Sequence, residues 1–119
     1  MRRDKDWQKL EDAIAEKLKE IDPFCMPTPG SGNGNCKGDI KFSEPIPLHW
    51  ECKQRATKNV TIVMDVFDKL KAEIPFHTKK TAVLALENKD KRRFAVLDLT
   101  DFLEMYIEYH KLKNGEENV

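Results

Sequence analysis

Two acidic residues and a lysine lie at strand-like spacing in the segment "KGDIKFSEPIPLHWECKQR", residues 37–55. Because side chains alternate along a strand, Glu51 and Lys53 share one face of the "LHWECKQR" segment. Asp39 lies on the face opposite Ile40 in the "GDIKF" segment by the same rule. If the two segments pair as a hairpin, we expect Asp39, Glu51 and Lys53 to meet on one side of a sheet.

A third acidic residue, Glu11, lies on the apolar side of the first predicted helix. It follows Trp7 by four residues and precedes Ile14 by three, intervals that place it along the apolar stripe. A carboxylate at a packing face needs a partner, because an unpaired buried charge is very costly. A divalent metal ion held jointly with Asp39 and Glu51 would supply that partner.

The chemistry of such a group is metal-assisted hydrolysis. Carboxylates, backbone carbonyls and waters form a hard-oxygen site suited to Mg²⁺, with Mn²⁺ as a substitute. A metal bound there can polarise a phosphoryl oxygen and lower the pKa of a bound water. Lys53 can orient or deprotonate that water, or stabilise charge that grows on the phosphate. These residues therefore suit the hydrolysis of a phosphodiester.

Hydrophobic periodicity predicts the elements that position these residues. A first helix over residues 5–20 is ended by Pro23, and a second is closed by Pro75. Strands are predicted at 38–42, 48–55, 80–87 and 94–99, with "SEPIP" and "NKDKRR" as turns. Thr100 is expected to cap a last helix. The helices are marked by Trp7, Leu10, Ile14, Leu18 and Ile21, then by Val60, Val63, Phe67, Leu70 and Ile74, and last by Phe102, Leu103, Tyr106 and Ile107.

The element order is then α-β-β-α-β-β-α, which predicts an α/β (α+β) fold with one mixed central sheet flanked by helices. A chain of 119 residues is expected to form a single domain over residues 1–119. Within it, the Pro- and Gly-rich stretch 27–38 is predicted to be a flexible loop. Residues 114–119 are predicted to be a frayed tail.

The motif Gly38-Asp39 followed by Glu51-Cys52-Lys53, with Glu11 on a preceding helix, resembles the signature of PD-(D/E)XK nucleases. The Gly-Ser-Gly segment before Asp39 is similar to that of archaeal Holliday junction resolvases and related phage endonucleases. The resemblance implies a restriction-endonuclease-like core of α-β-β-β-α-β type, Mg²⁺ dependence and cleavage of DNA. It assigns metal binding to Glu11, Asp39, Glu51 and the backbone carbonyl of Cys52, and a catalytic role to Lys53.

The same resemblance matches Ser31 to a loop serine that approaches DNA. Contact with the DNA backbone needs clustered positive charge, for which Lys53, Arg55 and Lys58 are the first candidates. The hairpin bases Lys89, Lys91, Arg92 and Arg93 are the second group. Symmetric cutting of two strands calls for two active sites, so we expect a homodimer.

Composition is that of a globular protein, with 39% hydrophobic and 35% charged residues. Lys plus Arg equals Asp plus Glu at 21 each, so the net charge does not point to an acidic partner. Neither an apolar leader nor a membrane span is predicted, and three cysteines do not make a disulfide framework. A cytoplasmic location is therefore expected, and the resemblance to archaeal and phage enzymes implies a prokaryotic cell or a phage-infected host.

Two alternatives remain open. The first is a non-catalytic module on the same scaffold that binds nucleic acid or a protein partner. The second is a structural zinc domain, because Cys25, Cys36, His49 and Cys52 are of ligand types that zinc accepts. The spacing contains no C-x-x-C pair, and His49 and Cys52 should point to opposite faces of one strand.

Overall fold

The computed structural model describes residues 6–28, 40–41, 47–76, 78 and 80–115. In this part of the chain the fold is mixed α+β, with three helices and a three-stranded mixed sheet. The elements follow the order α1, β1, β2, β3, α2, β4, β5 and α3. The predicted order is confirmed apart from one additional short strand, β1, before the first predicted strand.

The main sheet contains β3 (Leu48–Gln54), β4 (Thr81–Glu87) and β5 (Arg93–Val96), in that order. The strands β3 and β4 run parallel, whereas β5 returns antiparallel to β4 across the predicted turn. Six of the seven residues of β4 are buried, as expected for a continuous apolar run that is covered on both faces. The central strand is therefore the core of the molecule.

A second, two-stranded sheet pairs β1 (Met26–Pro27) with β2 (Ile40–Lys41) in antiparallel fashion. The expected hairpin between the Ile40 and Leu48 segments is therefore wrong in the described residues, since β2 pairs with β1 and β3 pairs with β4. The expected single sheet is likewise divided into two. Two prolines in "SEPIP" lack the backbone N–H that a hairpin ladder would use. Pairing with β4 instead gives β3 a ladder along its whole length.

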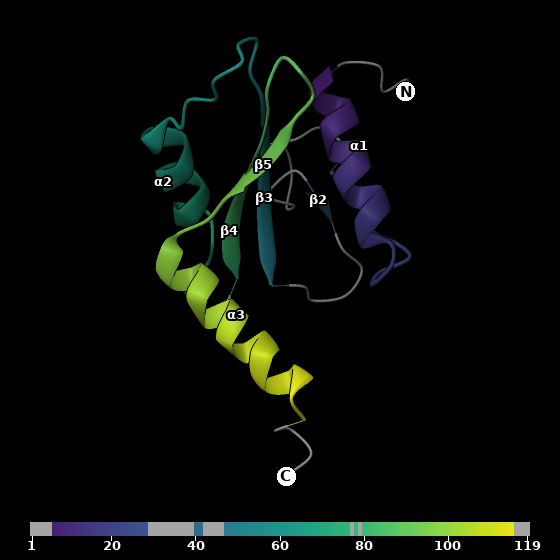
Figure 1. Cartoon of the computed structure of the whole chain (residues 1–119), viewed down its shortest axis with the longest axis vertical. Helices are drawn as coiled ribbons and strands as arrows, with labels where there is room; N and C mark the ends of the chain where they lie inside the picture. Colours follow the sequence, from purple (N-terminus) through teal and green to yellow (C-terminus); the bar gives the residue numbers. More distant parts are fainter. Residues whose placement is uncertain (1–5, 29–39, 42–46, 77, 79, 116–119) are drawn as a thin grey trace.

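The helices α1 (Asp6–Leu18) and α2 (Met64–Ala72) cover opposite faces of the main sheet (Figure 1). On the α1 side, one apolar cluster joins the helix to β3 and β4, with Ile14 and Trp50 packed against it. The α2 side has a larger cluster, with Val60, Val66, Ile74 and Val96 packed against it. The buried members are Leu10, Cys52 and Ala85 on the α1 side, and Phe67, Leu70, Ala82, Leu84 and Leu86 on the α2 side.

Both helices are shorter than their hydrophobic spacing predicts. The first ends at Leu18, and Ile21 beyond it is 65% exposed. The second begins at Met64, because Val63 has an extended backbone and occupies the position before the helix. β-branched residues favour extended backbone, so Val60 packs against the core from an irregular segment instead of from α2.

The last helix, α3, spans Leu99–Lys113 and has no buried residue. Its cap is Asp98, whose carboxylate accepts hydrogen bonds from the backbone N–H groups of Thr100 and Asp101. The prediction of Thr100 as the cap is therefore wrong by two residues. These backbone donors, above all that of Asp101, and the Lys71 ammonium lower the pKa of Asp98.

Two predicted boundaries of irregular structure also move. The predicted loop 27–38 begins too early, because Pro27 belongs to β1 and Thr28 is 4% exposed. The predicted tail 114–119 also begins too early, because Asn114 is the C-cap of α3. The rest of both segments, apart from Gly115, lies outside the described residues.

The position of Leu84 at the centre of β4, with 0% exposure, predicts a strong effect of truncation. We expect Leu84→Ala to lower the free energy of unfolding by roughly 2–5 kcal/mol, because the lost methyl groups leave a cavity between β4 and α2. Chemical denaturation measures this value. Leu99→Ala, at a 68% exposed position, is the matched control and should change stability little; equal effects would contradict this assignment of the core.

Candidate functional site

Glu51 and Lys53 lie together on β3, as their alternation predicts. The Lys53 ammonium is 3.2 Å from a Glu51 carboxylate oxygen, and the side chains are 40% and 25% exposed, respectively. Both belong to the face of β3 that carries His49, which contacts α2. The pair is thus half-exposed, within reach of solvent and of a ligand.

Glu11 comes from the other side of the sheet. It is 2% exposed, and its neighbour Leu10 packs against Cys52 on the α1 face of β3. By alternation, Cys52 and Glu51 point to opposite faces of the strand. The two acidic residues therefore flank β3 and are not on one surface. Since β3 is the end strand of the three-stranded sheet, a shared ligand would have to sit at its outer edge.

Asp39 and Ser31 lie outside the described residues. Asp39 directly precedes Ile40 of β2, which is 5% exposed and packs in the cluster of Ala15 and Cys25. In the described ranges, no group of three His, Cys, Asp or Glu residues is arranged to hold a metal. Two of the predicted carboxylates flank the edge of β3, and their hard oxygens suit Mg²⁺, but they do not make a complete site without the third.

His49 is buried at 5% exposure and meets the end of α2. Its Nε2 lies 2.8 Å from a carboxylate oxygen of Glu73, the residue that caps α2. This contact fixes the face of β3 that carries Glu51 and Lys53 against α2. Sequence reasoning placed His49 on the correct face and missed its partner, because Glu73 is 24 residues away in the chain.

The structure unites the two groups of basic residues that the sequence predicts separately. The side-chain amide of Asn88 donates to the Lys58 carbonyl at 3.0 Å. Its oxygen accepts from the backbone N–H groups of Asp90 and Arg92, at 2.9 and 3.0 Å. Asn88 therefore fastens the tip of the β4–β5 hairpin to the segment that follows β3.

Two backbone hydrogen bonds run beside this connection, from the Arg55 N–H to the Glu87 carbonyl and from the Lys89 N–H to the Thr57 carbonyl. They hold side by side two segments that carry exposed cationic residues, among them Lys58 and Lys89. We define the basic surface as the cationic residues of these two segments: Arg55, Lys58, Lys89, Lys91 and Arg92. Lys91 also lies 3.8 Å from a Glu87 carboxylate oxygen, whereas Arg93, which pairs with Glu87 at 2.7 Å, belongs to β5 and is not included. The basic surface continues from Lys53 at the same end of β3.

Glu87 is a buried carboxylate that the sequence analysis did not single out. It is 2% exposed, accepts from Arg93 Nε at 2.7 Å and from the Gln54 amide at 3.1 Å. Gln54 thus points away from Glu51, as alternation predicts. The sequence contains a signal for the Glu87–Arg93 pair. Glu87 ends an apolar run, and Arg93 lies across the predicted hairpin turn from it.

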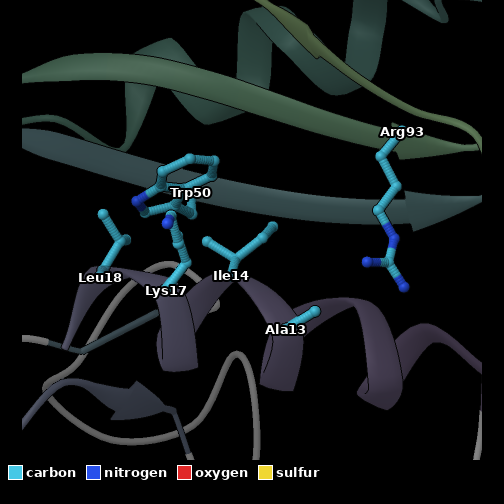
Figure 2. Close-up of a pocket in the computed structure, with 6 residues that line it drawn as sticks. All are labelled: Ala13, Ile14, Lys17, Leu18, Trp50 and Arg93. Atoms are coloured by element: carbon cyan, nitrogen blue, oxygen red, sulfur yellow. The ribbon is translucent and has the colours of Figure 1, made fainter. Parts of the chain in front are cut away.

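A cavity of about 260 Å³ lies between α1 and the sheet, and Figure 2 shows the side chains that line it. Ile14, Leu18 and Trp50 form its apolar wall, and Lys17 and Arg93 lie at its margin. Both cations already have acidic partners, Glu20 for Lys17 and Glu87 for Arg93. Because Trp50 is on the α1 face of β3, this cavity lies on the other side of the strand from Glu51 and Lys53.

Two of the predicted zinc ligands are buried thiols in separate clusters. Cys25 packs with Ala15 and Ile40, whereas Cys52 packs with Leu10. Burial, and then the nearby Asp22 carboxylate, raise the pKa of the Cys25 thiol and so favour its protonated form. His49 points to the face opposite Cys52, as expected, and Cys36 lies outside the described residues. The described ligands thus do not converge on a zinc ion.

Comparison with family models, with curated proteins and with solved structures finds no match for the chain. Among the helices of the described residues, none has the length and hydropathy that crossing a bilayer requires.

The hydrogen bonds of Asn88, a residue that is 3% exposed, predict that it stabilises the basic surface. We expect Asn88→Ala to lower the free energy of unfolding by roughly 2 kcal/mol, because it leaves buried polar groups without partners. It should also speed amide hydrogen exchange at Asp90 and Arg92. The control Asn59→Ala removes an exposed side-chain amide from the segment that follows β3. If both variants lower the free energy of unfolding by the same amount, Asn88 does not hold the hairpin to that segment.

Proposed function

We propose that this protein is a Mg²⁺-dependent endodeoxyribonuclease that hydrolyses phosphodiester bonds in branched or duplex DNA. The observation that carries the proposal is the half-exposed Glu51–Lys53 pair on an edge strand that leads directly into the basic surface. The pair offers a carboxylate and an ammonium where a phosphate can approach. The basic surface offers the positive charge that holds a DNA backbone.

The metal would be held by carboxylate oxygens of Asp39 and Glu51, by the Cys52 carbonyl and by Glu11. When bound, the ion would polarise the phosphoryl oxygen and provide an acidic water. Glu11 would reach the ion around the outer edge of β3, because Glu11 is buried on the face of the strand opposite to Glu51. Its burial holds a carboxylate in one position, as a ligand must be held.

Lys53 acts on the attacking water and on the phosphate. Its 3.2 Å contact with Glu51 holds the ammonium next to the proposed ligand. From there it orients the water or donates to a phosphate oxygen on which negative charge grows. His49 and Glu73 support the pair from behind, because they fix this face of β3 against α2.

The DNA backbone would lie along Lys53, Arg55 and Lys58, with Ser31 from the preceding loop. The basic surface extends this path onto the β4–β5 hairpin. Lys58 and the hairpin residues Lys89 and Arg92 are exposed there, so their side chains can neutralise phosphates without loss of core packing.

The order of the described elements supports the same proposal. From α1 through β1, β2, β3 and α2 to β4, the chain follows the α-β-β-β-α-β order that the resemblance to PD-(D/E)XK nucleases implies. Cutting both strands of a junction would call for a homodimer, with one active site in each copy.

A second candidate function is a non-catalytic nucleic-acid-binding module. It is favoured by a basic surface that is assembled by Asn88 and by backbone hydrogen bonds, without use of the candidate metal ligands Glu11 and Glu51. Calorimetric titration with Mn²⁺ distinguishes the two. Binding that is lost in Glu51→Gln supports the nuclease, whereas DNA binding in the absence of metal binding supports the module.

For the nuclease, Glu51→Gln and Asp39→Asn are expected to reduce cleavage of a synthetic four-way junction in Mg²⁺ by roughly 100-fold or more, because each removes charge from the metal site. Glu11→Gln should weaken Mn²⁺ binding if the carboxylate reaches the ion. Glu16→Gln is the matched control, since Glu16 lies exposed on α1 beside Lys19. Cleavage that persists in both Asp39 and Glu51 variants would refute the assignment.

For the basic surface, the double variant Lys58→Ala/Lys89→Ala is expected to weaken duplex binding uniformly across sequences. The slope of log affinity against log salt should fall by about 1–2, one unit per lost phosphate contact. Fluorescence anisotropy with a labelled duplex at several salt concentrations measures it. Lys17→Ala, an exposed lysine on α1, should leave the slope unchanged; an unchanged slope in the double variant would remove the hairpin from the interface.

A further inference from the structure

A second cavity, of about 330 Å³, lies between the segment that follows β3 and the β4–β5 hairpin. The two segments leave the sheet at the same end (Figure 1). The volume is at the lower end of the roughly 300–1,000 Å³ range of small-ligand pockets, which suits a single flat ring system. We call this cavity the hairpin pocket; it is lined by Lys58, Asn59 and Val60 from the first segment and by Asn88, Asp90, Arg92 and Phe94 from the hairpin.

The hairpin pocket is held in one shape by the fold. The Asn88 side chain donates to the Lys58 carbonyl and accepts from the backbone N–H groups of Asp90 and Arg92, so one buried amide joins both sides of the pocket. Between the last two residues, Lys91 has a φ of 66°, in the left-handed region that costs energy for any residue except glycine. Such a backbone persists only where the surrounding structure fixes it. The pocket is therefore pre-formed.

Phe94 gives the hairpin pocket a flat aromatic wall. Its side chain is 37% exposed, and the guanidinium carbon of Arg92 lies 5.3 Å from the centroid of its ring. Nucleobases that have left their own stack are bound in proteins on aromatic rings and on the planar guanidinium group of arginine. The two side chains thus offer the kinds of surface on which an unstacked base binds.

The charges around the hairpin pocket favour a base over a phosphate as its occupant. Lys58 and Arg92 belong to the basic surface and attract the phosphates of a nucleic-acid backbone. Asp90 also lines the pocket, and its negative charge opposes a second anion inside it. The amino groups of adenine, guanine and cytosine are donors that a carboxylate or the amide oxygen of Asn59 can accept. A nucleotide therefore fits with its phosphate on the basic surface and its base in the pocket.

The sheet places Phe94 on the same face as the candidate catalytic pair. Phe94 of β5 is the register partner of Leu86 on β4, and Leu86 is the register partner of Lys53 on β3. Register partners project from the same face, and two strand spacings separate the backbones of Lys53 and Phe94 by about 10 Å. This separation is about three base steps at roughly 3.4 Å each. One DNA strand can thus reach both Lys53 and the pocket.

We propose that the hairpin pocket binds one unstacked nucleobase of a DNA whose backbone lies on the basic surface. A base inside a paired duplex is stacked on both faces, and extracting it costs least where it is already unpaired. The favoured substrate is therefore DNA that contains an unpaired nucleotide. This inference rests on the proposed binding of DNA to the basic surface, and it is independent of cleavage.

Fluorescence anisotropy of the full chain with three labelled DNAs of equal length, in the presence of EDTA, tests the proposal. The first DNA is a fully paired duplex, the second carries one unpaired adenine, and the third has an abasic residue in place of that adenine. We expect the unpaired adenine to raise the affinity about 10-fold over both other DNAs, since stacking of one base on an aromatic side chain is of that order. The abasic DNA separates binding of the base from binding of a bend.

Substitutions of Phe94 assign the preference to the hairpin pocket. Phe94→Leu keeps an apolar side chain and removes the flat ring, so it should abolish the preference for the unpaired adenine. The affinity of this variant for the paired duplex should stay unchanged, which also shows that it is folded. Phe94→Tyr retains the ring and should retain the preference. The matched control is Phe102→Leu on α3, a residue of similar exposure (43%), which should leave the preference intact.

Equal affinities of the unaltered protein for the unpaired-adenine and abasic DNAs would overturn the proposal, as would a preference that survives Phe94→Leu. Failure to bind any of the three DNAs would overturn it together with the role of the basic surface. Cleavage of a four-way junction in Mg²⁺ is measured separately. A base preference without cleavage would refute the nuclease and keep the pocket, whereas cleavage with equal affinities would refute only the pocket.

Discussion

The burial of β4 on both of its faces is the constraint on which the rest of the structure depends. Leu84 and Leu86 face α2, whereas Ala85 faces α1. A strand with this much apolar surface needs a packed element on each face and a hydrogen-bonded strand on each edge. The two helices and the flanking strands β3 and β5 meet those needs. Among the candidate catalytic side chains that the structure describes, Glu11 lies on α1, and Glu51 and Lys53 lie on β3.

The parallel pairing of β3 with β4 decides what the acidic and basic residues of β3 can do. It directs Cys52 and Trp50 to α1, and His49, Glu51 and Lys53 to the other side. A ligand of both Glu11 and Glu51 must therefore bind around the edge of the strand. The same pairing leads the chain from β3 to the β4–β5 hairpin, where Asn88 fastens it. One sheet edge thus joins the candidate chemistry to the candidate DNA surface.

The charged residues at the β4–β5 hairpin are of two kinds, those paired within the fold and those exposed on its surface. The buried Glu87 carboxylate pairs with Arg93, its cross-strand neighbour on β5, whose side chain is 48% exposed. Lys58 and Lys89, on the two segments that Asn88 joins, have exposed side chains that a ligand can reach. At the other end, α3 contributes nothing to the core and keeps its aromatic rings on the surface. The α3 helix and the β4–β5 turn lie at opposite ends of the molecule (Figure 1).

The sequence by itself determined that three helices form, where the strands other than β1 lie, that "TAVLALE" is covered on both faces and that Glu51 and Lys53 share a face, because each depends on local periodicity. It did not determine that β2 would pair with β1, that Glu11 and Glu51 would flank β3 or that α3 would stay exposed. The sequence predicted Thr100 as the N-cap of α3 in place of Asp98, because both side chains carry oxygens that can accept from the first backbone N–H groups. Only the tertiary structure decided these points, since strand partners and helix packing depend on contacts between residues far apart in the chain.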